Sequence, residues 1–125
     1  LQVVLFMDKI LEQALLYDFY GELLTYHQKS IYEDFVLNDF SLSEIGEDRK
    51  ISRQGVYDII KRCDRLLNSY EDKLHLVQKF LTAKDQVAKI HEFAGEILKT
   101  EDIPETSTEY LRQIESISNS ILEEM

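Results

Sequence analysis

Polar and basic side chains in residues 41–65 have the types and the spacing that suit contact with nucleic acid. Arg53, Gln54, Tyr57 and Lys61 recur at helical intervals, so they should share one exposed stripe of a helix. In the major groove arginine suits guanine and glutamine suits adenine, while basic and hydroxyl side chains hold phosphates. The predicted contact residues are Ser41, Arg49, Lys50, Ser52, Arg53, Gln54, Tyr57, Lys61, Arg62 and Arg65.

Two helix starts in close succession should position these side chains. Ser41 and Glu44 have the spacing of a capping box, and Ser52 is the expected N-cap of the next helix, eleven residues later. Helices joined by so short a turn must cross steeply, which predicts a helix-turn-helix over residues 42–65. Two apolar pairs with the spacing of a hydrophobic staple flank the starts: Phe40 with Ile45, and Ile51 with Val56.

The charge of this stretch differs in sign from that of the rest of the 125-residue chain. Residues 49–65 hold six basic and two acidic residues and carry +4, whereas the remainder carries −14 and the whole chain −10. Nonspecific DNA binding requires many cations, which an acidic chain lacks. A single basic patch on an acidic body would instead offer an anionic partner one orientation.

Apolar residues recur at intervals of three and four along most of the chain, which predicts an all-α fold. We expect a first helix near residues 8–23, a second helix opened by a Thr25/Gln28 capping box, and then the helix-turn-helix pair. Residues 1–70 should enclose one compact core. The side chains of the fourth helix expected to face that core are Val56, Ile59, Ile60 and Cys63.

Beyond residue 70 the pattern predicts a C-terminal helical extension. The fourth helix should continue as an arm over residues 71–99, with a bend or a new helix near Thr82, where the apolar stripe shifts. Residues 100–108 are the expected linker, and a capping box of Thr106 and Glu109 should open a helix at 109–125. The long stripe suggests a homodimer formed through residues 67–81 or through the C-terminal helices.

Catalytic, metal and cofactor sites have no signature in the sequence. His27, His75 and His91 are far apart, no nucleotide-binding P-loop is present, and Cys63 has no neighbouring general base. We therefore expect no enzyme activity, no metal and no cofactor. The apolar residues 1–7 are too few to span a membrane, which predicts a cytoplasmic protein without membrane insertion. We interpret residues 1–6 as an extension ahead of the natural start.

The stretch LSEIGEDRKISRQGVYDIIKR, preceded by LLYDFYGELLT and followed by YEDKLHL, resembles the YlxM family of small bacterial proteins. The match spans residues 7–81 and is most specific in SRQ-x-VYD-x-IKR and YE-x-KLH. The resemblance implies an all-helical cytoplasmic protein with a helix-turn-helix similar to region 4 of bacterial sigma factors. It also implies a gene beside those of the signal recognition particle GTPase and a regulatory role in that pathway.

Two residues depart from the usual helix-turn-helix pattern. Lys50 stands where the turn commonly carries glycine, so it must adopt a less favourable backbone or shift the turn. Arg49 stands where an apolar residue often packs inside. Gly46, in contrast, supplies the small residue that a close helix crossing needs.

Two interpretations of function remain. In the first, the chain is a non-enzymatic regulator that meets the signal recognition particle GTPase, or its RNA, through the basic patch or the arm. In the second, it is a sequence-specific DNA-binding transcriptional regulator that places Arg53, Gln54 and Tyr57 in the major groove. The simpler alternative for these side chains is a solvated helical turn that has no ligand.

Overall fold

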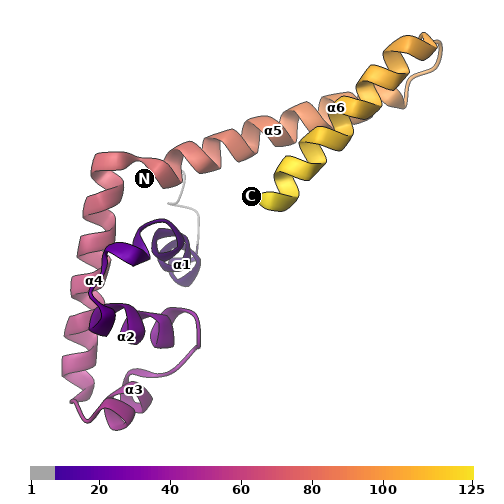
Figure 1. Ribbon diagram of the computed structural model, residues 1–125. Coiled ribbons are helices and arrows are strands. Elements are labelled where there is room, and N and C mark those ends of the chain that lie inside the picture. Colours follow the sequence, from indigo (N-terminus) through magenta and orange to yellow (C-terminus); the bar gives the residue numbers. More distant parts are fainter. Residues whose placement is uncertain (1–7) are drawn as a thin grey trace. The chain divides into compact units, whose positions relative to one another are not determined.

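The computed structural model describes residues 8–125, so the extension expected at residues 1–6 lies outside the described residues. Within this range there are six α-helices, one 3-10 helix and no strand, which confirms the all-α fold (Figure 1). The chain divides into two compact units, the first ending at Gln78 and the second spanning Lys79–Met125. The elements are α1 (Lys9–Tyr20), η2 (Gly21–Leu23), α2 (Tyr26–Val36), α3 (Leu42–Arg49), α4 (Arg53–Leu74), α5 (Leu76–Leu98) and α6 (Glu105–Glu124).

Polar side chains fix the helix starts of the first unit where the sequence predicts them. The capping boxes that begin at Thr25 and Ser41 each form both of their hydrogen bonds. Ser52 Oγ accepts a hydrogen bond from the backbone N–H of Gly55 at 2.9 Å. Because a cap of this kind contributes about 1 kcal/mol, the three together define where α2, α3 and α4 begin.

Helix α4 is the central element of the first unit, and α1, α2 and α3 all pack against it (Figure 1). This arrangement confirms the predicted compact core of four helices. Ile59 is only half-buried, although we expected it to face inward. The buried apolar side chains of α4 are Val56, Ile60, Cys63 and Leu67. Since Leu67 lies in this core, its side chain is not available to the dimer interface suggested for residues 67–81.

Two carboxylates also lie in this core, which the apolar pattern does not predict. Asp64 accepts hydrogen bonds from Gln13 Nε2 at 2.9 Å and from the Tyr32 hydroxyl at 2.6 Å, and so links α4 to α1 and α2. Glu71 is fully buried and accepts a hydrogen bond from the Tyr20 hydroxyl at 2.5 Å. These donors offset the cost of burying charged groups.

The break between α4 and α5 lies at His75, so the bend expected near Thr82 is wrong. His75 takes a left-handed conformation with φ of 56°, and α5 then runs without interruption through Thr82. The Glu71 carboxylate accepts hydrogen bonds from the backbone N–H groups of Val77 at 2.9 Å and Gln78 at 3.1 Å. It thereby satisfies two backbone N–H groups in the first turn of α5. These groups have no acceptor within the helix, because the chain of helical carbonyl groups begins only there.

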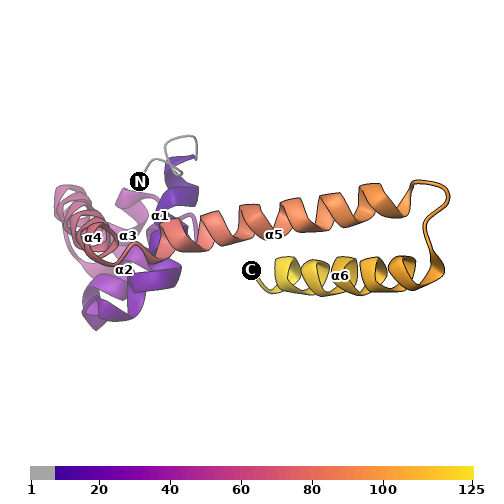
Figure 2. The same ribbon diagram turned by 90° about the horizontal axis from the view of Figure 1, so that it is seen from above.

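The second unit is a helical hairpin, in which α6 runs antiparallel beside α5 (Figure 2). The two helices meet where His91 Nδ1 lies 3.1 Å from Ser118 Oγ. Ala94 and Ser118 are each only 3% exposed at this contact. Two small side chains and the His91 ring therefore lie at the point where the two helices touch.

The last helix begins at Glu105, so the capping box expected from Thr106 and Glu109 is wrong. Pro104 occupies the N-cap position with φ of −56° and provides no side-chain hydrogen bond. Its ring presets a backbone angle close to that of a helix, which allows the helix to start earlier than the polar pattern indicates. None of the helices in residues 8–125 combines the length and the apolar character needed to cross a membrane.

Candidate nucleic-acid interface

The turn between α3 and α4 brings the two helices close together through Gly46. The backbone N–H of Ile51 donates to the carbonyl oxygen of Gly46 at 3.0 Å. A Cβ atom at position 46 would lie 2.7 Å from the carbonyl oxygen of Ile51, closer than real contacts allow. This geometry confirms the prediction that the crossing needs a small residue at this position.

Lys50 forms the turn in a less favourable backbone conformation, which is the first of the two alternatives that the sequence leaves open. Its φ of 59° and ψ of 41° place it in the left-handed region, where glycine is usually found. A left-handed conformation costs a residue with a Cβ atom roughly 1–2 kcal/mol. The turn therefore keeps its geometry at the cost of local strain and does not shift along the chain.

One side of the first half of α4 brings together Arg53, Gln54, Tyr57 and Lys61, and we refer to these four residues as the α4 stripe. Arg53 and Gln54 are exposed in the first turn of the helix, and Tyr57 is 41% exposed one turn later. Lys61 Nζ lies 5.4 Å from the centroid of the Tyr57 ring, within the range of a cation–π interaction. The stripe thus presents hydrogen-bond donors, an aromatic ring and positive charge on one side.

Asp58 adjoins the α4 stripe, although it is not one of the predicted contact residues. Its Oδ1 atom accepts a hydrogen bond from Gln54 Nε2 at 3.0 Å, which holds the amide along the helix. A glutamine amide carries two N–H donors, so one of them remains free for a base. A carboxylate can itself accept a hydrogen bond from the amino group of cytosine.

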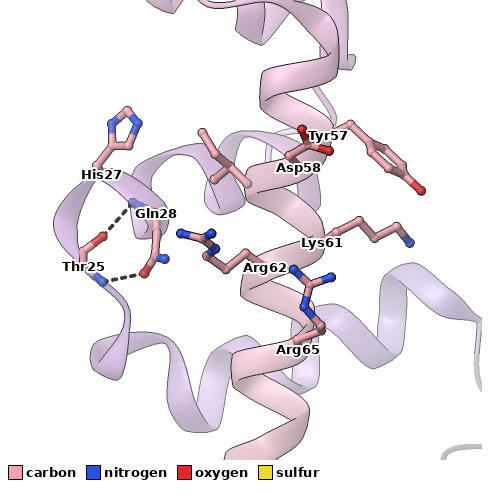
Figure 3. A pocket seen from close by; sticks show the side chains of 9 residues that line it. Thr25, His27, Gln28, Tyr57, Asp58, Lys61, Arg62 and Arg65 are labelled. Atoms are coloured by element: carbon pink, nitrogen blue, oxygen red, sulfur yellow. Dashed lines mark hydrogen bonds between the residues drawn. The ribbon is translucent and has the colours of Figure 1, made fainter.

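A hollow of about 840 Å³ lies between the start of α2 and the middle of α4 (Figure 3). In Figure 3 Arg62 is directed toward the start of α2, whereas Lys61 extends to the opposite side of α4 together with Tyr57. The first turn of a helix presents free N–H groups and a partial positive charge. The hollow is thus suited to an anion such as a phosphate. Its polar lining is Thr25, His27, Gln28, Tyr57, Asp58, Lys61, Arg62 and Arg65, in which three basic side chains outnumber the one carboxylate.

Thr25 and His27 were not among the predicted contact residues. The sequence shows the capping box at Thr25, but it does not show that the start of α2 faces residues 58–65 of α4. That proximity depends on how α2 packs against α4, and the sequence provides no local signal for it.

Besides Gln54, which is bonded to Asp58, three more of the predicted contact residues have hydrogen-bond partners within the protein. Arg49 Nη2 donates to Ser30 Oγ at 2.6 Å and to Asp34 Oδ2 at 2.8 Å, so it links α3 to α2. Ser41 and Ser52 accept backbone hydrogen bonds as helix caps. Each serine hydroxyl keeps its own hydrogen, which can still be donated to a phosphate oxygen.

Cys63 is a core residue of α4 and is fully buried. Burial raises the pKa of its thiol to about 11, which disfavours the nucleophilic thiolate. Across residues 8–125, no group of three or more His, Cys, Asp and Glu side chains is arranged to hold a metal ion.

Residues 7–107 match a family described as "Putative helix-turn-helix protein, YlxM / p13 like" and designated UPF0122. A UPF0122 protein of Acetivibrio thermocellus is 44% identical over 117 residues, which cover 94% of this chain and 97% of that protein. A UPF0122 protein of Caldanaerobacter subterraneus is 52% identical over 85 residues, 68% of this chain and 73% of the relative. The UPF0122 protein YlxM of Bacillus subtilis is 43% identical over 97 residues, 78% of this chain and 88% of the relative. The chain belongs to the YlxM/p13-like family of helix-turn-helix proteins, as its sequence motifs predict.

Proposed function

We propose that this chain is a non-enzymatic, cytoplasmic regulatory protein whose α4 stripe binds DNA in the major groove. The observation that carries the proposal is that Arg53, Gln54 and Tyr57 are exposed on the first half of α4, with the half-buried Lys61 beside the Tyr57 ring. Helix-turn-helix proteins place the N-terminal residues of their second helix against base edges. The stripe has the chemistry for this task, and it lies within a segment of +4 in a chain of −10.

Each side chain of the stripe has a partner in this proposal. Arg53 would donate to the O6 and N7 atoms of a guanine, and Gln54 would pair with an adenine. Tyr57 would contact the methyl group of a thymine, with Lys61 held beside its ring at 5.4 Å. Only the first-turn residues would therefore distinguish one base pair strongly from another.

The hollow beside the stripe would receive the phosphate backbone. Arg62 and Arg65 line it together with the first turn of α2. Such contacts carry no sequence information, but they release counterions, so that each makes binding more sensitive to salt. A homodimer would carry two of these surfaces and could span two half-sites.

Selection of a preferred DNA site, followed by fluorescence anisotropy over a range of salt concentrations, tests the proposal. Alanine at Arg53 or Gln54 should cost about 1–3 kcal/mol on that site. Alanine at Arg62 or Arg65 should weaken binding to all sequences alike and reduce the salt slope by about 1. Lys84→Ala changes an exposed lysine of α5 and provides a matched control. A chain that shows no salt-sensitive DNA binding at low ionic strength would overturn the proposal.

The alternative function is regulation of the signal recognition particle through its GTPase or its RNA. Exposed aromatic rings favour it, because unpaired RNA bases stack on such rings. Tyr57 is 41% exposed, and Tyr26, the first residue of α2, is 87% exposed. Addition of this protein should then change the turnover of that GTPase, and alanine at Tyr26 and Tyr57 should weaken binding to its RNA. An unchanged turnover together with no RNA binding and no co-purification would remove this alternative.

A further inference from the structure

The helical hairpin of the second unit exposes seven large apolar side chains. Their exposed fractions range from 40% to 63%, although residues of these types are normally buried. On α5 the residues are Ile90, Phe93 and Ile97, and on α6 they are Tyr110, Ile114, Ile117 and Ile121. We refer to these seven residues as the hairpin face.

The helical geometry places all seven residues on the same side of the hairpin. At 100° per residue, the exposed residues of α5 lie about a third of a turn from His91, Ala94 and Gly95, which contact α6. The exposed residues of α6 lie about a third of a turn, in the same rotational sense, from Glu115 and Ser118, which contact α5. Because the helices run antiparallel, equal rotations bring both stripes onto one face (Figure 2).

A hairpin with this pattern lacks the second layer that a stable helical core requires. Its two helices contact each other through small or polar side chains, such as Ala94, Gly95 and Ser118. The seven larger side chains of the hairpin face lie away from that contact, whereas Leu98, Leu111 and Leu122 are half-buried. An apolar helix face is stable when another element covers it, and two antiparallel helices alone cannot provide that cover.

We propose that the hairpin face is a dimer interface, in which two copies of the chain pack their hairpins face to face as a four-helix bundle. At the exposed fractions measured here, the seven side chains offer on the order of 700 Å² per hairpin. A stable interface buries roughly 800 Å² per partner, so a second copy of the same face is a sufficient occupant. The face is also uncharged, which suits burial against an identical surface.

The charges on the two helices favour one of the two symmetric arrangements. Identical hairpins can meet with α6 against α6, or with α5 of each copy against α6 of the other. α6 carries five glutamates and one arginine, whereas the three lysines of α5 are balanced by three acidic residues. Facing α6 helices would bring together two negative excesses, which is unfavourable. The dimer therefore pairs α5 with α6 of the second copy.

The molecular mass of the full-length chain in solution is the first test. Sedimentation velocity at micromolar concentrations should give twice the monomer mass of 14.7 kDa. The Ile114→Glu/Ile117→Glu variant should sediment as a monomer with unchanged far-ultraviolet circular dichroism, because both side chains are exposed in the single chain. The control variant Ser116→Glu/Ser120→Glu adds the same charge to exposed positions off the face and should remain dimeric. A monomeric wild-type chain, or a dimer that persists in the Ile114/Ile117 variant, would overturn the proposal.

Disulfide crosslinking tests the pairing of helices and does not depend on how well the glutamate variant folds. Phe93 and Ile117 lie at similar heights along the hairpin, because His91 contacts Ser118. A mixture of Phe93→Cys and Ile117→Cys chains should form several-fold more crosslinked dimer than either variant alone. Equal crosslinking in all three samples would contradict the pairing of α5 with α6. Neither experiment involves DNA, so its outcome is separate from that of the DNA-binding test.

Discussion

Arg49 of α3 and Asp34 of α2 form an ion pair, with 2.8 Å between Arg49 Nη2 and Asp34 Oδ2. Both side chains are largely buried, and the same guanidinium nitrogen also donates to Ser30 Oγ. The pair replaces the apolar contact that often lies at this point of a helix-turn-helix. Since it joins the helix that precedes the turn to α2, it holds α3 in position relative to the α4 stripe.

Loss of the Arg49 side chain should therefore lower the stability of the fold and leave the DNA affinity of the folded protein unchanged. Arg49→Ala leaves the Asp34 carboxylate without its ion-pair partner and with only the hydrogen bond from Asn38 Nδ2, and we expect the free energy of unfolding to fall by about 1–3 kcal/mol. Urea denaturation of Arg49→Ala, Asp34→Ala and the double variant should give a coupling energy of about 0.5–3 kcal/mol. Additive losses would show that the two side chains do not interact in solution. A DNA affinity that remains normal below the unfolding transition would show that Arg49 does not contact a phosphate.

Gly46→Ala should destabilise the helix-turn-helix. The added Cβ atom would lie 2.7 Å from the carbonyl oxygen of Ile51, and a backbone atom cannot move aside as easily as a side chain. We expect a loss of about 1–3 kcal/mol, typical of an overpacked site, measured by urea denaturation. Gly55→Ala provides a control, because the atom nearest to its new Cβ is the Ser52 hydroxyl oxygen at 3.1 Å. An equal loss in both variants would argue against a close crossing at Gly46.

Lys50→Gly should have the opposite effect and raise the stability. Glycine adopts the left-handed conformation of this turn, with φ of 59°, without steric cost. We expect a gain of up to about 1 kcal/mol, because the relief of strain exceeds the extra entropy of an unfolded glycine. Lys50→Ala removes the same charge but keeps the Cβ atom, so it should give no comparable gain. If both variants melted at the same temperature, the removed charge would explain the change better than the backbone.

The sequence predicts the features of this fold that depend on local interactions. The capping boxes at Thr25 and Ser41 and the strained turn at Lys50 can be recognised because each rests on residues within a few positions of one another. The α5 break could not be predicted from local pattern alone. It depends on Glu71, whose carboxylate bonds to Val77 and also to Tyr20, 51 positions earlier in the chain. The contribution of Thr25 to the hollow could not be predicted for the same reason, since only tertiary packing brings the start of α2 close to α4.

Tyr20 should make the stability of the first unit depend on pH in alkaline solution. Burial and the hydrogen bond to Glu71 raise the pKa of Tyr20 to about 12 from its usual value of 10.0. Because the folded-state pKa is the higher one, folding favours the neutral phenol. Its contribution is complete below pH 10 and is lost as the pH rises from 10 toward 12.

The Tyr20→Phe variant isolates this contribution, because the other buried tyrosines, Tyr17 and Tyr32, remain in place. At pH 9 the variant should be about 0.5–1.5 kcal/mol less stable than the wild type, since it lacks the hydroxyl that donates to Glu71. Urea denaturation at a series of pH values should then show the two proteins converging as the pH approaches 11, because only the wild type loses this bond by ionisation. Stabilities that decline in parallel over this range would mean that Tyr20 ionises equally well in the folded and unfolded chains. In that case the hydroxyl would not bind the Glu71 carboxylate in solution, and the connection from α1 to the start of α5 would depend on apolar packing and on the hydrogen bond that the hydroxyl accepts from the backbone N–H of Leu76 at 3.1 Å.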